Sequence, residues 1–324
     1  MGHAGKFTTS IALRLASSIP SLQQHICDAV KERRDIASQS LRDQWQQLVL
    51  RPLSKLSENG GQFSYVLVVD ALDECDNDNN VRTIIYLLAK VRSLKTVRLQ
   101  VFLTSRPEIP IRYGIHQIPD AEYQDFVLHN ISSSIVDHNI RTFLDHIFKL
   151  IAHKRSFAAG WPGEEIIKRL VQNASGLFIW AATACRFIRE GKRFAAKRLN
   201  MILEHNSTAI NIPEKHLNEI YTTVLRHCIS SEYSDEEADE LRSMLKSLLG
   251  SIMTLLSPLS TQSLSKLLSS SQDDVDQTQD DLHAILNIPK DRSCPLHLHH
   301  PSFRDFLFES TRCKEFSRSK PITY

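Results

Sequence analysis

The sequence predicts an α/β first part followed by a mostly α-helical second part. Two short apolar runs, 65–69 and 98–103, are separated by residues 80–95, whose apolar positions recur at helical spacing. A strand, a helix and a second strand within about forty residues form a βαβ unit, which implies a parallel sheet. From residue 136 onward most segments have helical spacing, so the character of the chain changes after Pro119.

The first part begins with helices. In residues 7–18, Ile11, Leu15 and Ile19 recur at helical spacing, and Pro20 ends the helix. Further helices are expected at 21–33 and 40–56, followed by a loop at 57–61.

The two apolar runs are expected to be buried strands. The run 65–69 is continuous and rich in valine, which is typical of a parallel strand that is covered on both faces. The run 98–103 is expected to be a second buried strand, ended by Ser105, Arg106 and Pro107. We therefore expect two neighbouring strands in the middle of a layered α/β structure.

The second part is expected to be a helical domain and a winged-helix-like domain. Helices are predicted at 136–155, 163–174, 176–190, 194–205, 213–230, 235–250 and 257–268. Ser234 is a candidate N-cap, with acidic residues in the turn that follows it. The acidic stretch 270–281 is expected to be a solvated loop. Two paired strands, 282–288 and 294–300, and a final helix, 301–309, complete the wing. The predicted domains are 1–130 (α/β), 131–210 (helical), 211–312 (winged-helix-like) and 313–324 (tail).

The composition excludes several classes of protein. The formal net charge is only +2, so no overall field favours nucleic acid or a membrane surface. The six cysteines include no CxxC pair, which argues against a zinc site or a disulfide framework. The stretch MGHAGKFTTS lacks the apolar core that a signal peptide would have, and the longest apolar run is about half of what a bilayer requires. We expect a soluble, cytoplasmic protein.

The most informative stretch is 65–77, YVLVVDALDECDN. Asp70 follows the first apolar run directly, and Asp73 and Glu74 come one turn later. The carboxyl end of a parallel strand faces the crevice in which such sheets bind ligands. A carboxylate there can hold Mg²⁺ beside nucleotide phosphates, and nearby acids can orient or deprotonate a water. This is a Walker B pattern; the alternative is a core strand with a solvated acidic turn.

The second strand strengthens that interpretation. The sequence VFLTSRPE places Thr104, Ser105 and Arg106 at the end of the neighbouring strand. An arginine at this edge can sense or neutralise a γ-phosphate. The alternative for Arg106 is an ion pair with a surface acid. The two strand ends together are more specific than either alone.

The start of the chain, GHAGKF, is not a P-loop. A P-loop requires G-x-x-x-x-G-K-[ST] between a strand and a helix. Here Gly2 and Gly5 are three positions apart, Phe7 occupies the hydroxyl position after Lys6, and no strand precedes Gly2.

Several stretches together resemble the NACHT-type signal-transduction NTPases of filamentous fungi, the nephrocystin-like nucleotide switches. The resemblance begins with VLVVDALDECD and VFLTSRPEIP. It continues through GLFIWAATACRFI (176–188), LNEIYTTVL (217–225), LLSPLS (255–260) and HHPSFRDFL (299–307). It therefore covers nearly the whole chain, and it implies an incomplete P-loop-NTPase-like sheet. By the same comparison the chain lacks the Walker A segment and a C-terminal repeat array.

The resemblance implies a nucleotide-dependent switch that oligomerises. Asp70 matches the Walker B aspartate linked to Mg²⁺, and Asp73 and Glu74 match the acidic pair beside the catalytic water. Arg106 matches the sensor arginine. His300 matches the winged-helix histidine that reaches the ADP phosphates; its alternative is a local contact at a strand end. The implied cofactor is Mg²⁺ with ATP, ADP or GTP, although a truncated chain is expected to bind or hydrolyse nucleotide poorly, if at all, by itself.

Other interpretations remain open at this point. His297, His299 and His300 suggest a metal site, but no spacing of further ligands completes one. The basic stretch 186–198 suggests nucleic acid, although such a run is more often the solvated face of a helix. Besides the truncated switch, the chain could be a non-catalytic interaction module that pairs with a full-length relative, or a fragment without independent function. Protein partners or self-association are expected.

Overall fold

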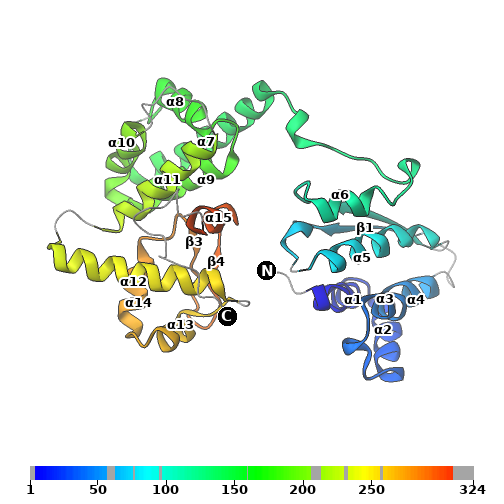
Figure 1. Cartoon of the computed structure of the whole chain (residues 1–324). Helices are drawn as coiled ribbons and strands as arrows, with labels where there is room; N and C mark the ends of the chain where they lie inside the picture. The colour runs from blue at the N-terminus through cyan, green and yellow to red at the C-terminus, as the bar shows by residue number, and fades with distance from the viewer. Residues whose placement is uncertain are drawn as a thin grey trace. The chain divides into compact units, whose positions relative to one another are not determined.

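The computed structural model contains two compact units, Met1–Phe126 and Val127–Tyr324 (Figure 1). It describes residues 4–56, 63–75, 77–94, 97–158, 160–205, 213–229, 233–255 and 258–308. The loop predicted at 57–61 and the tail predicted at 313–324 lie outside these residues. The further division of the second unit into two domains stays a prediction.

The first unit contains a parallel βαβ arrangement preceded by helices. Its main elements are α1 (Phe7–Ser18), α2 (Pro20–Glu32), α3 (Leu41–Trp45), α4 (Arg51–Ser54), β1 (Phe63–Val69), α5 (Asp78–Ala89), β2 (Val97–Leu103) and α6 (Ile109–Ile115). A π-helical segment, Gln46–Leu50, joins α3 to α4. The helices predicted at the start and the two predicted strands are confirmed, whereas α6 was not expected from the sequence.

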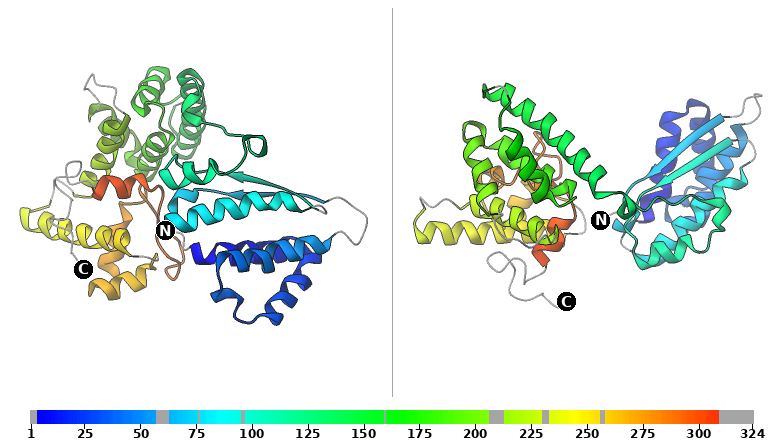
Figure 2. Two further views of the ribbon diagram at one scale, coloured as in Figure 1. Left: turned by 45° about the vertical axis from the view of Figure 1, so that its right-hand side comes forward. Right: turned by 90° about the horizontal axis from the view of Figure 1, so that it is seen from above.

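The two strands pair in parallel, as predicted. Val66 lies beside Gln100 and Val68 lies beside Phe102, in unbroken register to Val69 and Leu103. The strands lie side by side as cyan arrows in the right-hand view of Figure 2. The register fixes which strand ends meet, because residues that follow Val69 and Leu103 leave the sheet at the same level.

The expectation that both faces of these strands are covered is wrong. Side chains alternate along each strand, and only one set packs against the helices of the first unit. That set is Tyr65, Leu67, Val69, Val97, Leu99, Val101 and Leu103. On the opposite face Val66 is 63% exposed and Phe102 is 55% exposed. A continuous apolar run therefore gave the strands correctly but not the coverage of their second face.

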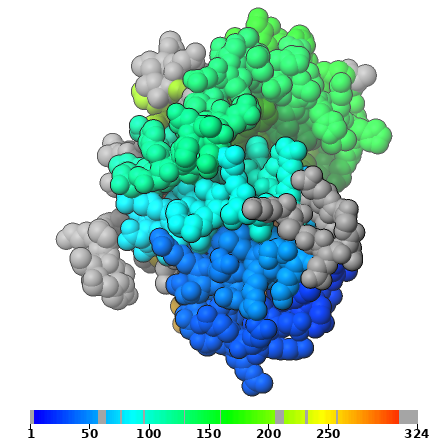
Figure 3. Space-filling model, turned by 90° about the vertical axis from the view of Figure 1, so that its right-hand side faces the viewer, coloured from blue at the N-terminus to red at the C-terminus, as the bar shows by residue number. Residues whose placement is uncertain are grey.

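The N-terminal helices and the sheet share one apolar core. Trp45 is 1% exposed, and the ring of Phe7 stacks against it with 6.2 Å between the two ring centroids. In Figure 3 the blue N-terminal helices and the cyan residues that follow them form one continuous body. Phe7 therefore anchors α1 in the core, which gives a structural reason for an aromatic residue directly after Lys6.

In the residues that the structure describes, the second unit is helical apart from one short pair of strands. Its elements are α7 (Ser133–Arg155), α8 (Glu164–Ala174), α9 (Phe178–Glu190), α10 (Ala195–His205), α11 (Pro213–His227), α12 (Asp235–Thr254), α13 (Thr261–Leu268), α14 (Gln272–Asp280), β3 (Leu286–Asn287), β4 (His297–Leu298) and α15 (Ser302–Phe308). Paired strands were predicted at 282–288 and 294–300, and an antiparallel pair is present, but each strand has only two residues. Ser234 caps α12 in a capping box with Glu237, also as predicted. No helix that the structure describes is both long enough and apolar enough to cross a bilayer.

The acidic stretch predicted as a solvated loop is the helix α14. The Ser271 hydroxyl accepts a hydrogen bond from the Asp274 amide and caps the first turn. Acidic residues in that turn stabilise the helix, because their negative charge lies at the positive end of the helix dipole. Val275 and Gln279 turn a narrow face inward, where they are 2% and 4% exposed. The prediction was wrong because the high charge of the stretch concealed this cap and its narrow buried face.

Two half-buried histidines should make the second unit sensitive to acid. Burial, with the positive charge of Arg198, lowers the pKa of His227, and burial also lowers that of His299. The unfolded chain then binds protons that the folded chain rejects, so stability rises with pH in this range. We expect the second unit to lose stability as the pH falls below about 6.5, the ordinary histidine pKa. Urea unfolding at pH values on both sides of that point measures how the free energy of unfolding changes with pH. His227→Gln should make this change smaller. His138→Gln, at an exposed position of α7, is the control and should leave it unchanged.

Candidate functional site

The carboxyl ends of β1 and β2 bring Asp70 and Thr104 together. The Thr104 hydroxyl donates a hydrogen bond to Asp70 Oδ1. The same hydroxyl accepts the Ala71 amide hydrogen at 2.9 Å, and the Thr104 amide donates to the Val69 carbonyl at 2.9 Å. Asp70 is exposed. Thr104, at the end of β2, thus orients the exposed carboxylate of Asp70, at the end of β1.

A left-handed residue turns the chain sharply after Asp70. Ala71 has φ 53° and ψ 53°, a conformation that costs energy for any residue other than glycine. The turn is held in place because the Leu72 amide donates to the Thr104 carbonyl at 3.1 Å. Leu72 is 2% exposed and anchors the short 3₁₀ turn Leu72–Glu74 in the core. The turn carries Asp73 back across the end of β2.

Asp73 binds the residues that follow β2. Its Oδ1 accepts the Ser105 hydroxyl at 3.2 Å and the Arg106 amide at 3.0 Å. Its Oδ2 lies 3.6 Å from Arg106 Nε. The Asp73 side chain is 7% exposed and that of Arg106 is 45% exposed. The structure therefore brings these two predicted catalytic residues together as an ion pair, with the acid largely buried.

Glu74 and Asp70 are the two exposed carboxylates of this edge. The Glu74 amide donates to the Ala71 carbonyl at 3.0 Å, so its backbone belongs to the same turn. Among the described residues, no group of three or more histidine, cysteine, aspartate or glutamate side chains is placed to hold a metal ion. Such an edge suits Mg²⁺, which often takes only one or two protein carboxylates and completes its shell with phosphate oxygens and water.

His300 belongs to the second unit and lies two residues before the start of α15. Its Nδ1 accepts the Ser302 amide at 3.1 Å and lies 2.7 Å from the Ser302 hydroxyl. The Ser302 hydroxyl lies 2.8 Å from the hydroxyl of Tyr221, which is 1% exposed. Burial raises the pKa of Tyr221, so its hydroxyl stays protonated. Since Nδ1 accepts, the neutral ring carries its hydrogen on Nε2. The local contact weighed for His300 is therefore present.

Sequence reasoning gave no role to Thr104, Ser302 or Tyr221. Thr104 was detectable in principle, because a hydroxyl residue after one strand lies level with the acid after its parallel neighbour. Ser302 and Tyr221 are 81 positions apart, and no local pattern links them.

The other candidate sites gain little support. His299 Nε2 donates to the His283 carbonyl at 3.2 Å, which occupies one nitrogen of the suggested metal site. In the basic stretch, Arg198 is 8% exposed and donates to the Phe187 carbonyl at 2.9 Å. Arg198 is therefore part of the core and does not lie on a basic surface.

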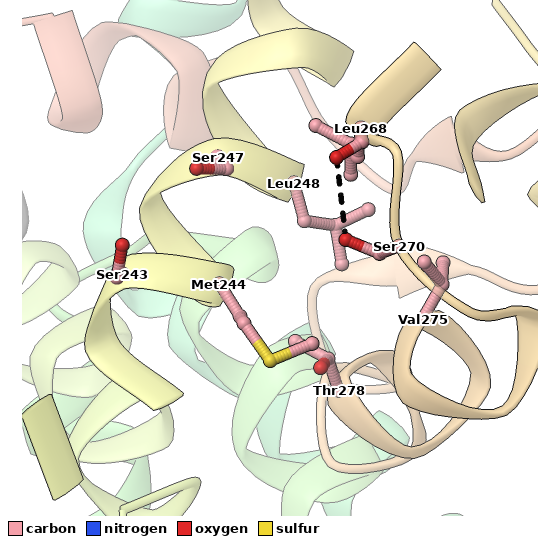
Figure 4. A pocket seen from close by; sticks show the side chains of 8 residues that line it. All are labelled: Ser243, Met244, Ser247, Leu248, Leu268, Ser270, Val275 and Thr278. Carbon is pink, nitrogen blue, oxygen red and sulfur yellow. Dashed lines mark hydrogen bonds between the residues drawn. The ribbon is translucent and has the colours of Figure 1, made fainter. Parts of the chain in front are cut away.

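A cavity of about 220 Å³ opens among α12, α13 and α14 of the second unit (Figure 4). Its lining residues are Ser243, Met244, Ser247, Leu248, Leu268, Ser270, Val275 and Thr278. They are uncharged, and the Ser270 hydroxyl donates to the Leu268 carbonyl at 3.4 Å across the cavity wall. No predicted site residue lines it, so its size alone does not make it the functional site.

Comparison with known families gives one match, which covers the strand ends. Residues 2–106 match the family model described as Nephrocystin 3, N-terminal. The match includes β1, β2 and the turn that carries Asp70, Asp73 and Glu74, and it ends at Arg106. Neither the curated proteins nor the solved structures give a match.

Proposed function

We propose that the first unit carries the magnesium-binding half of a nucleotide site, and that the chain derives from a NACHT-type switch NTPase. One observation carries this proposal: an exposed Asp70 stands at the carboxyl end of β1 and is oriented by Thr104 of the adjacent parallel strand. Ligands of parallel sheets bind at that edge. The family match over residues 2–106 supports the same assignment.

Each residue of the edge has a proposed role. Asp70 holds Mg²⁺, directly or through a water, and bound Mg²⁺ would neutralise phosphate charge. In the acidic pair, Glu74 is exposed and able to orient a water, while Asp73 holds the second strand end. Arg106 can reach a phosphate only if it exchanges its contact with Asp73 for the ligand.

The second unit is proposed to combine a helical domain with a winged-helix-like domain built from α12 to α15 and the β3–β4 pair. His300 is its proposed phosphate contact, with Ser302 fixing the ring so that Nε2 carries the hydrogen. ATP and GTP both fit the proposal. Protein partners or self-association would read out the bound nucleotide.

Binding by this chain alone is expected to be weak. The sequence contains no G-x-x-x-x-G-K-[ST] motif, whose amides and lysine provide most of a P-loop's grip on phosphate. We expect Mg²⁺ with ADP to shift the amide NMR signals of 70–74 and 104–106, with half-saturation near millimolar ADP. Asp70→Asn should remove the magnesium-dependent part of these shifts, whereas Asp120→Asn, at an exposed position away from the strand ends, should not. Shifts elsewhere, or shifts that persist in Asp70→Asn, would contradict the proposal.

A further inference from the structure

The parallel sheet of the first unit has one open face. The side chains on this face are Ser64, Val66 and Val68 of β1 and Arg98, Gln100 and Phe102 of β2. Val66 and Val68 are each 63% exposed, and Phe102 is 55% exposed. Parallel sheets are normally covered on both faces, so adjacent exposed valines and a phenylalanine here indicate a surface that something covers.

The charges at the two ends of this face are opposite. Arg98 lies at the end where the strands begin, and it has no carboxylate partner among the described residues. Asp70 follows the last residue of β1, continues the outward row after Val68, and is exposed. Between them lie only apolar or neutral side chains. The face is therefore positive at one end, apolar in the middle and negative at the other end.

Such a face is complementary to itself when one copy is turned end for end. A twofold axis at the level of Leu67 and Val101, between two stacked sheets, places Val66 against Val68 of the second copy. The same rotation brings Arg98 to the level of Asp70 of the second copy, and the reverse pair forms at the other end. Stacked sheets lie about 10 Å apart, a distance that valine and arginine side chains bridge.

We propose that the open face is a homodimer interface in which two copies of this chain stack their sheets in antiparallel orientation. Isologous contacts of this kind are the commonest way in which identical chains associate. Two strands of seven residues form a face of roughly 23 by 10 Å, so the contact is small. The area is well below the roughly 1,200–2,000 Å² that stable specific interfaces bury, so we expect only a weak, reversible dimer with a dissociation constant of about 100 μM. This inference does not depend on nucleotide binding.

Sedimentation equilibrium of the full chain, without nucleotide or Mg²⁺, tests the proposal. We expect Val66→Glu to weaken dimerisation at least tenfold, because it places two carboxylates in the apolar centre of the interface. Leu13→Glu is the matched control: Leu13 is 69% exposed on α1, outside the sheet, and its variant should dimerise like the parent chain. Both positions are exposed, so neither variant should impair folding.

A charge exchange tests the orientation. Arg98→Asp and Asp70→Arg should each weaken the dimer, and the double variant should restore it, because the pairs re-form with reversed sign. A parent chain that stays monomeric up to about 500 μM, a concentration several times the dissociation constant expected of a small interface, would overturn the proposal. So would equal dimerisation of the Val66→Glu and Leu13→Glu variants, or a double variant that does not recover. Coverage of the face by another part of the same chain would give the first of these results.

Discussion

Replacing Trp180 with alanine is expected to destabilise the second unit by about 3–5 kcal/mol, the usual cost of removing a large buried aromatic side chain. Trp180 on α9 is fully buried, and its indole N–H donates to the His216 carbonyl of α11 at 3.1 Å. His216 in turn lies 2.8 Å, through Nδ1, from the Asn173 carbonyl of α8. The substitution therefore leaves a cavity where three helices meet and removes the side-chain hydrogen bond to the His216 carbonyl.

Urea unfolding of the full chain measures this loss. Trp180→Phe keeps most of the volume and removes only the donor, so it should cost about 0.5–1.5 kcal/mol, the usual net contribution of one hydrogen bond. If the alanine variant does not fold at all, the phenylalanine variant still provides the measurement. A cost below about 1 kcal/mol for Trp180→Ala would mean that the second unit does not pack around this residue.

The parts of the fold that were predictable from sequence are those with a local signal. Short apolar runs predicted the two parallel strands. Ser234 and the acidic residues after it predicted the N-terminal cap of α12. The open sheet face had a signal only in the second strand, where Arg98 and Gln100 alternate with Leu99 and Val101, because the run 65–69 is equally apolar on both sides. Whether a second layer covers it depends on the rest of the molecule.

The candidate site also has parts that the sequence could predict and parts that it could not. Asp70 was predictable because an acid after a buried parallel strand lies at the ligand edge wherever the strand packs. The pairing of Asp73 with Arg106 was not, since it depends on the left-handed Ala71 and brings together residues 33 positions apart. The sequence places three acids in one motif, and only the turn distinguishes the exposed Asp70 and Glu74 from the largely buried Asp73.

Replacing Asp73 with alanine is expected to destabilise the first unit by about 2–3 kcal/mol, because hydrogen bonds to a charged acceptor are among the stronger ones and their loss strands the donors. The carboxylate joins the ends of β1 and β2 through the Ser105 hydroxyl, the Arg106 amide and the Arg106 side chain. Its removal should also loosen the turn that positions Asp70. Glu74→Ala, at the exposed neighbouring acid, is the matched control and should stay within about 0.5 kcal/mol of the parent chain.

The contribution of Arg106 separates two explanations of that loss. The guanidinium is 45% exposed and lies 3.6 Å from Asp73, so water screens the pair and Arg106→Ala should cost less than about 1 kcal/mol. The Ser105 hydroxyl and the Arg106 amide should account for the larger share, because the amide contact survives any side-chain change at position 106. Urea unfolding of Asp73→Ala, Arg106→Ala and the double variant forms a complete cycle. If Arg106→Ala costs as much as Asp73→Ala, the side-chain ion pair holds the strand ends together, and a ligand that withdraws Arg106 would then open the edge.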